Sequence, residues 1–348
     1  MKRFFLLALW LSFGMNVAQA ETIYQYGTQC AKEVSVIPAF SCMAGEVIPI
    51  TVGGKTPDTY TPNMTCDKPS LLPATGEGAQ GQCLPGTRAL VLRDDATAQI
   101  SAICRKKVVR PMDSHLFDEI NIISHNLKNG KTCWFTAQAS EPLKADAGID
   151  GRLVPSPTAA SAMQGYRTLE TKSKALSQTW HVDTKTLPNP KQFWLSPLAV
   201  AASKPACMYC HDSGPFMYSP YIAQTTQLPG DPLGKYRPKA VGTDFKKQWQ
   251  DLTAFGITTR GNTCTTCHRM GNMNSCSFAT LQATAQAPQA GGDDWSKKFP
   301  ESHWMSPGNL RSLHQWNEAF TSSLKKIADC CQNPKANGCQ IVDYSKTK

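Results

Sequence analysis

The sequence predicts an α+β protein in two parts: a disulfide-stapled, β-rich domain over residues 21–140 and a mainly helical, loop-rich region over residues 164–348. Three observations carry this prediction. Short stretches with β-branched residues and partial alternation fill the first part, and six cysteines lie among them. A segment rich in Pro, Gly and Ala (141–163) is expected to be a linker. Apolar residues at helical spacing follow that segment.

The strands of the first part are expected in four segments. Residues 36–40, 46–52 and 88–104 combine β-branched side chains with breaks at Gly and Pro. Residues 119–137 are predicted to form two strands around a turn at 126–131, because its Asn-Gly pair favours a tight hairpin. Residues 69–82 are expected to form a loop.

Two helices are expected in the second part. Residues 243–256 place Phe245, Trp249 and Leu252 at helical spacing. A longer amphipathic helix is predicted over 309–331, with Asn309 as its N-cap. Its apolar face consists of Leu310, Leu313, Trp316, Phe320, Leu324 and Ile327.

Residues 1–20 have the pattern of a secretory signal peptide. Lys2 and Arg3 precede an apolar run (4–13), and the sequence AQA at 18–20 fits a cleavage site. No later stretch is long and apolar enough to predict a membrane span. We therefore expect a periplasmic or secreted protein, with no integral membrane segment after cleavage.

The formal net charge is +10, or +8 once Lys2 and Arg3 are removed. The charges are dispersed, so nucleic-acid binding is not favoured. A basic surface would instead suit an acidic protein partner, with an encounter rate that depends on ionic strength. The sequence contains no pattern typical of a Ser-His-Asp triad, a phosphate-binding loop or a Rossmann nucleotide site.

All 14 cysteines lie after the signal peptide, a number that an oxidising compartment uses as disulfides. Four belong to two CxxCH motifs, and the other ten permit five bridges. Adjacent Cys330 and Cys331 are expected to bond elsewhere, because a bridge between neighbours strains the backbone. One plausible scheme for the rest pairs chain neighbours: Cys30 with Cys42, Cys66 with Cys83, and Cys104 with Cys133.

The two motifs are CMYCH at 207–211 and CTTCH at 264–268. In this order, each cysteine can add to a haem vinyl group, and the histidine coordinates the iron from one side. A redox dithiol would need a βαβ context that is lacking, and a four-cysteine zinc site would leave both histidines unexplained. Two copies behind an export signal predict two covalently attached haem c groups. The residues concerned are Cys207, Cys210, His211, Cys264, Cys267 and His268.

The ligand on the opposite side of each iron bears on function, because methionine or histidine closes the iron whereas an open position admits a small ligand. Met305, 37 residues after His268, is predicted to serve the second haem, with His303 as its rival. For the first haem we favour His125, from the predicted hairpin. Further alternatives are Met217, Met270, Met273, His115, His181 and His314.

The two motifs, the methionine-bearing loop and the closing helix resemble small class I c-type cytochromes. HWMSP (303–307) is similar to the Trp-Met-Pro-Pro loop that presents the methionine ligand in several of them, with Ser306 replacing the first proline. A longer resemblance is to exported bacterial proteins with a cysteine-rich N-terminal part before two haem motifs. It is carried by VIPAFSC, HNLKNGKTC, RLVPSP, CHDSGPFMYSPYI, TCTTCHRMG and SHWMSPG. It implies a di-haem cytochrome with a cytochrome c-like haem region.

The sequence thus predicts a non-enzymatic electron carrier between periplasmic redox partners. The alternative is a di-haem peroxidase-like enzyme with an open side on one haem, although such enzymes are similar only in having two motifs, which lie farther apart. A third hypothesis is a binding module in 21–140 that docks a redox partner or a surface polymer.

Overall fold

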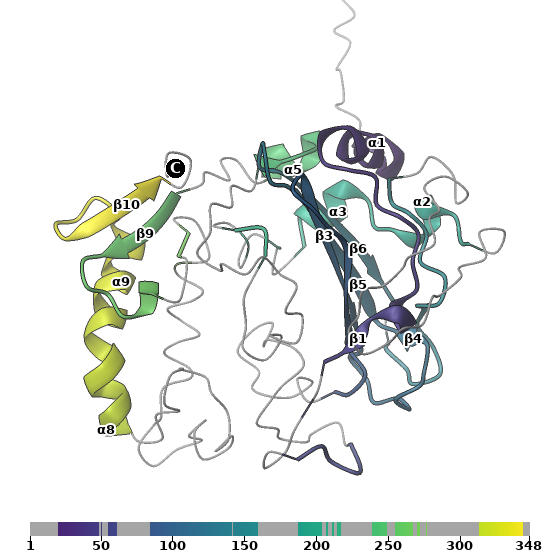
Figure 1. The fold of residues 1–348 in the computed structure, drawn as a ribbon, viewed down its shortest axis with the longest axis horizontal. Coiled ribbons are helices and arrows are strands. Elements are labelled where there is room, and N and C mark those ends of the chain that lie inside the picture. The colour runs from purple at the N-terminus through teal and green to yellow at the C-terminus, as the bar shows by residue number, and fades with distance from the viewer. Residues whose placement is uncertain are drawn as a thin grey trace, which may run out of the picture.

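Figure 1 shows a large sheet and a helix near the C-terminus. Among the described residues, one hydrophobic cluster packs around the sheet, a second packs beneath the helix, and a small third contains Ala39 and Leu187. The structure is a computed structural model. It describes residues 20–48, 50, 55–60, 84–140, 142–158, 187–203, 207, 211, 214–216, 239–248, 255–266, 270–271, 276 and 313–343. The signal peptide prediction, the loop at 69–82 and the methionine-bearing loop therefore lie outside the described residues.

The larger body is built on a six-stranded sheet with the strand order β1-β2-β3-β5-β6-β8. Neighbouring strands are antiparallel, except that β6 and β8 run parallel. Two further short strands, β4 (Leu116–Phe117) and β7 (Ile149–Asp150), pair with each other. The sheet strands are β1 (Glu46–Val47), β2 (Arg88–Asp94), β3 (Ala98–Arg105), β5 (Glu119–Asn126), β6 (Lys131–Gln138) and β8 (Lys239–Ala240). The predicted β-rich character of the first part is confirmed.

The predicted hairpin forms between β5 and β6. The N–H of Gly130 donates to the carbonyl of Asn126 (2.8 Å), and Gly130 has a φ of 76°, which few other residues adopt without strain. The side-chain oxygen of Asn126 accepts from the N–H of Lys128 (2.9 Å), and that of Asn129 accepts from the N–H of Lys131 (2.8 Å). Local turn chemistry therefore favours the register of this pair.

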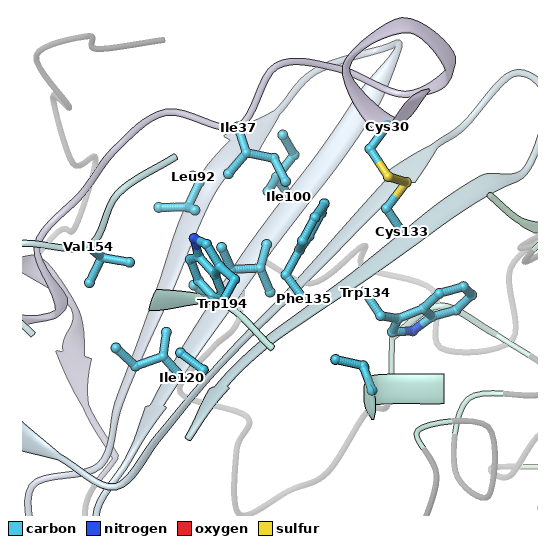
Figure 2. Packing of buried hydrophobic residues seen from close by; sticks show 14 of the residues in the cluster. Cys30, Ile37, Leu92, Ile100, Ile120, Cys133, Trp134, Phe135, Val154 and Trp194 are labelled. Carbon is cyan, nitrogen blue, oxygen red and sulfur yellow. A yellow bond between two sulfur atoms is a disulfide. The ribbon is translucent and has the colours of Figure 1, made fainter. Parts of the chain in front are cut away.

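Alternation along the hairpin sorts its side chains onto two faces. Ile122 lies opposite Phe135 on the core face, whereas Ile123 lies opposite Trp134 on the second face. Figure 2 shows Phe135 beside Trp194 on one side of the sheet and Trp134 pointing to the other side. The core face also carries Ile100, Ala102, Cys104, Ile120, Cys133 and Ala137, all nearly or fully buried.

Short helices surround this sheet, and the first was not predicted. Its capping box was nevertheless visible: the N–H of Gln25 donates to Thr22 Oγ1 (3.3 Å), and the N–H of Thr22 donates to Gln25 Oε1 (2.9 Å). The helical elements are α1 (Ile23–Glu33), the 3₁₀ turn η1 (Cys42–Ala44), α2 (Pro190–Phe193), α3 (Pro197–Ala201) and α5 (Thr243–Gln248).

Segments beyond residue 140 complete the same body. Trp194 and Phe245 belong to the main hydrophobic cluster, and β8 pairs with the edge of β6. Residues 142–158, assigned to a linker by composition, pack closely: Val154 is fully buried and forms a backbone bridge with Phe40. The sheet body is thus built from more of the chain than residues 21–140.

Four disulfides are described, and two of them overturn the neighbour scheme. Cys30 bonds to Cys133 and Cys42 to Cys104, across 103 and 62 residues, because α1 and η1 fold back onto the sheet. The expected pair of Cys66 and Cys83 lies outside the described residues. The expectation for the adjacent cysteines is confirmed, since Cys330 bonds to Cys339 and Cys331 to Cys276.

The second cluster joins the C-terminal helix to a two-stranded antiparallel sheet. Its elements are the strands β9 (Phe255–Thr259) and β10 (Cys339–Asp343), the 3₁₀ turn η2 (Cys264–Thr266), and the helical run α8 (Leu313–Trp316), η3 (Asn317–Thr321, π-helical) and α9 (Ser322–Gln332). The predicted final helix is confirmed from Leu313 onward. The helix predicted over 243–256 is wrong at its end, because Phe255 and Gly256 belong to β9. None of the helices in the described ranges is long and apolar enough to cross a membrane.

A buried ion pair joins two segments of the sheet body. Arg110 and Asp118 are almost fully buried and form two hydrogen bonds, Nη1 to Oδ2 (2.5 Å) and Nη2 to Oδ1 (2.6 Å). Arg110 also donates to the carbonyls of Lys144 (2.8 Å) and Ala147 (2.7 Å). The pair therefore anchors the segment before β7 to β5.

Removal of one partner should be strongly destabilising. We expect Asp118→Ala to lower the free energy of unfolding by about 3–5 kcal/mol, since it leaves the Arg110 guanidinium buried without its counter-charge. Urea denaturation measures this change. The control is Arg152→Ala, because the Arg152 side chain is 55% exposed in its pair with Asp150 and its removal should change the free energy of unfolding far less. Equal losses in both variants would contradict the prediction.

Lys106 should make stability depend on pH. It is fully buried, its Nζ donates to the carbonyl of Ser114 (2.8 Å), and burial followed by the charge of Arg88 lowers its pKa to about 8 from 10.5. Between these two pH values the unfolded chain binds the proton that the folded chain has released. The free energy of unfolding should therefore rise with pH across this window. In Lys106→Met that rise should shrink by on the order of 2 kcal/mol in urea titrations, and an unchanged slope would refute the assignment.

Candidate functional site

Two residues of the first CxxCH motif, Cys207 and His211, are joined through their backbones. The N–H of His211 donates to the carbonyl of Cys207 (3.0 Å), the spacing of an α-helical hydrogen bond. Residues four apart on such a turn present their side chains on the same side. The thiol of Cys207 and the imidazole of His211 therefore start from one face, as attachment and coordination of a single haem require. Cys210 lies outside the described residues.

His211 is held in its neutral form. Burial lowers its pKa to about 4, and the positive charge of Arg105 acts in the same direction. The carbonyls of Gly214 and Pro215 lie near enough to oppose this shift, although no hydrogen bond of good geometry reaches Nδ1 from the described residues. A neutral imidazole is the form that binds a metal ion.

The motif lies against the second face of the sheet. Arg105, whose charge acts on His211, is paired with Glu119 across β3 and β5 on that face. Five residues after His211, Phe216 meets the ring of His125 edge-on, with centroids 6.3 Å apart. Cys207 packs against the main hydrophobic cluster. The N-terminal sheet therefore forms one wall beside the first motif.

His125 is buried on this wall in a defined tautomer. Only 1% of it is exposed, and its Nδ1 lies 2.8 Å from Oγ1 of Thr132, its partner across the hairpin. The Thr132 hydroxyl donates its proton to the carbonyl of Gly130 (2.9 Å), so it accepts from Nδ1–H of His125. This assigns the lone pair of the ring to Nε2. Burial lowers the pKa of His125 to about 4, which keeps the ring neutral.

The second motif starts on a turn fastened to α9. The side-chain oxygen of Asn262 accepts from the N–H of Cys264 (2.9 Å), and its Nδ2 donates to the carbonyl of Ser323 (2.8 Å). The hydroxyl of Ser323 accepts from the N–H of Thr263 (3.0 Å). Packing of the final helix therefore positions Cys264. Cys267 and His268 lie outside the described residues.

The surroundings of Cys207 and Cys264 bear on the two alternatives to haem attachment, a redox dithiol and a zinc site. Burial raises the pKa of the Cys264 thiol, which is opposite to what a reactive dithiol requires. Cys264 belongs to the C-terminal cluster, whereas Cys207 packs against the sheet cluster, so a shared four-cysteine zinc site is not favoured. No group of three or more metal-binding side chains occurs within the described ranges.

The other predicted ligands fall into two groups. Met305 and its rival His303 lie outside the described residues, as do Met217, Met273 and His181, so the ligand of the second haem stays a prediction. His115 is partly buried, and its carbonyl accepts the N–H of Gly151 (2.9 Å). Met270 is buried in the C-terminal cluster, and His314 is exposed beside Glu318 (3.4 Å), as expected for a packed residue and a surface residue.

Sequence reasoning did not single out Thr132, Phe216 or Arg105. The position of Thr132 opposite His125 follows from the register of the predicted hairpin, which offered a usable signal. The contact between Phe216 and His125 had no such signal, because the two residues lie far apart in the sequence.

No protein-family model matches the chain, and comparison with curated proteins and with solved structures gave no match. Function is therefore inferred from the motifs and from the geometry around them.

Proposed function

We propose that this chain is an exported di-haem c-type cytochrome that carries electrons between periplasmic redox partners. The observation that carries this proposal is the backbone hydrogen bond from His211 to Cys207, whose helical spacing puts a thiol and a neutral imidazole on one side of the backbone. Cys207 and Cys210 would attach the first haem, with His211 as its ligand, and Cys264, Cys267 and His268 would hold the second. Bound haem supplies a reversible one-electron couple.

Use of the cysteines supports covalent attachment. Eight of the ten cysteines outside the motifs form the four described disulfides. Cys264 belongs to none of these bridges, although an oxidising compartment favours them. A thioether bond to haem would give this buried thiol a stable covalent partner.

His125 is the proposed sixth ligand of the first haem. Its hydrogen bond to Thr132 orients the ring and assigns the lone pair to Nε2, which would be the coordinating atom, an arrangement typical of histidine ligands. Its contact with Phe216 brings it to the segment that follows His211. Two histidine ligands would close the iron, which favours an electron carrier over the peroxidase-like alternative. Met305 remains the proposed ligand of the second haem.

Haem content tests the proposal directly. The full chain, matured in cells that load c-type cytochromes, should give about two haems per chain in the pyridine haemochrome assay. Cys207→Ser with Cys210→Ser, or Cys264→Ser with Cys267→Ser, should each leave about one haem, because each pair attaches one group.

The matched control is Cys330→Ser with Cys339→Ser, which removes a disulfide pair and should leave about two haems per folded chain. Absence of haem from wild type, in cells that load a reference c-type cytochrome, would end the cytochrome proposal.

Loss of the His125 side chain should leave the iron of one haem without its sixth ligand. In His125→Ala, electron paramagnetic resonance of the oxidised protein should convert one low-spin signal to high spin, because the iron loses its sixth ligand. Thr132→Val should perturb the same signal by freeing the ring, whereas Met305→Ala should affect only the other haem.

His115→Ala is the histidine control. His115 precedes β4, which pairs with β7 and does not belong to the six-stranded sheet that carries His125. The spectrum of this variant should match that of wild type. A wild-type spectrum from folded, fully loaded His125→Ala protein would exclude His125 as a ligand.

A further inference from the structure

One end of the sheet body carries a concentration of exposed lysines. The end is formed by the C-terminal turn of α1, the turn between β5 and β6, β8 and α5 (Figure 1). Five of its lysine side chains are exposed and one is partly exposed. This lysine surface consists of Lys32, Lys128, Lys131, Lys239, Lys246 and Lys247.

Tertiary contacts bring these separate elements together. Lys131 and Lys239 are direct partners in the parallel ladder between β6 and β8. The carbonyl of Glu33, the last residue of α1, accepts from the side chain of Asn126 in the hairpin turn (3.1 Å). Stacking of Phe245 on Tyr26, with centroids 4.9 Å apart, holds α5 against α1. The lysines therefore belong to one continuous region, although they come from distant parts of the sequence.

Carboxylates of the same elements do not balance this charge. Glu33 pairs with Lys131 at 3.5 Å. Asp244 is buried and accepts the N–H of Glu21 (3.0 Å), and Glu21 is itself buried and accepts the N–H of Thr243 (3.1 Å). These two carboxylates serve internal contacts. The neighbouring turn between β2 and β3, whose Thr97 carbonyl accepts the N–H of Leu127 (2.9 Å), adds the exposed carboxylates Asp94 and Asp95. Asp95 pairs with Arg93 (2.6 Å), so the lysines still leave an excess of positive charge facing the solvent at this end.

The lysine surface borders the first haem motif through His125. His125 and Thr132 immediately flank the turn 126–131 that carries two of the lysines, and His125 contacts Phe216. Leu127, 37% exposed, lies in the same turn. A small apolar spot bordered by charges is typical of transient protein–protein interfaces. It is a smaller apolar area than a membrane-surface helix buries.

We propose that the lysine surface docks an acidic redox protein, which exchanges electrons with this chain through its first haem. The docking role rests on the proposed cytochrome function. Transfer in one direction oxidises this chain by one electron and reduces the partner by one electron, and no bond forms or breaks. Complementary charge would raise the encounter rate and orient the partner at this end of the sheet.

The chain supplies a matched pair of charge reversals for the test. Lys246→Glu with Lys247→Glu alters the lysine surface, and Lys325→Glu with Lys326→Glu makes the same change on exposed residues of α9. The probe is an acidic flavodoxin, reduced, mixed with each oxidised variant in a stopped-flow instrument at low ionic strength. We expect the second-order rate constant to fall about tenfold in the first variant and less than about twofold in the second.

Equal rate constants in the two variants would overturn the proposal, since net charge alone would then govern the encounter. A membrane surface is tested with phosphatidylglycerol vesicles. If wild type binds them, Lys246→Glu/Lys247→Glu does not, and the flavodoxin rate constant is the same in both, the proposal is overturned in favour of membrane binding. Haem content is measured first, and its absence would refute the cytochrome function. Calorimetric binding of oxidised flavodoxin needs no haem, so it tests the docking surface separately; undiminished binding by the Lys246→Glu/Lys247→Glu variant would refute docking.

Discussion

The register of the β5–β6 hairpin is the constraint on which most of the sheet body depends. A slip by one residue would move Ile122 and Phe135 off the core face of the sheet and bring His125 and Trp134 onto it. The turn at Gly130 prevents that slip because its backbone conformation and the Asn126 hydrogen bonds fit only one pairing. The same register that builds the core therefore also places His125 opposite Thr132, against the segment that follows the first CxxCH motif.

The disulfides reinforce this arrangement from the core side. Cys133 lies between Thr132 and Trp134, and its bond to Cys30 fastens α1 to β6. Tyr26, one turn before Cys30, accepts the N–H of Trp134 with its hydroxyl oxygen (2.9 Å). The edge of β6 is thus covered where β8 does not reach it, which also removes an exposed strand edge. The rigid wall beside His125 is a consequence of this closure.

Haems bound at the two motifs would lie in different surroundings. The first motif lies against a sheet rich in polar and charged groups, including Arg105, whereas Cys264 is enclosed by Ile257, Met270 and the cysteines of the C-terminal cluster. Because charge and burial both set the reduction potential of a haem, these surroundings would separate the two potentials. The N-terminal part would then serve the cofactor and the partner together, and not act as an independent binding module.

The sequence by itself determined the features that depend on neighbouring residues. Turn chemistry identified the hairpin around Asn129 and Gly130, apolar spacing identified the final helix, and steric strain excluded a bond between Cys330 and Cys331. The two CxxCH motifs were likewise local patterns. The capping box of α1 was present as well, but the β-rich composition around it concealed the helix.

Only the tertiary structure decided which distant segments meet. The partners of Cys30 and Cys42, the pairing of β9 with β10 and the return of β8 to the sheet all depend on chain paths that composition does not encode. The same holds for the contact between His125 and Phe216 and for the gathering of lysines from α1, the hairpin turn, β8 and α5. Local sequence fixes turns and periodicity because their energies arise within a few residues, whereas these contacts arise from burying one cooperative core.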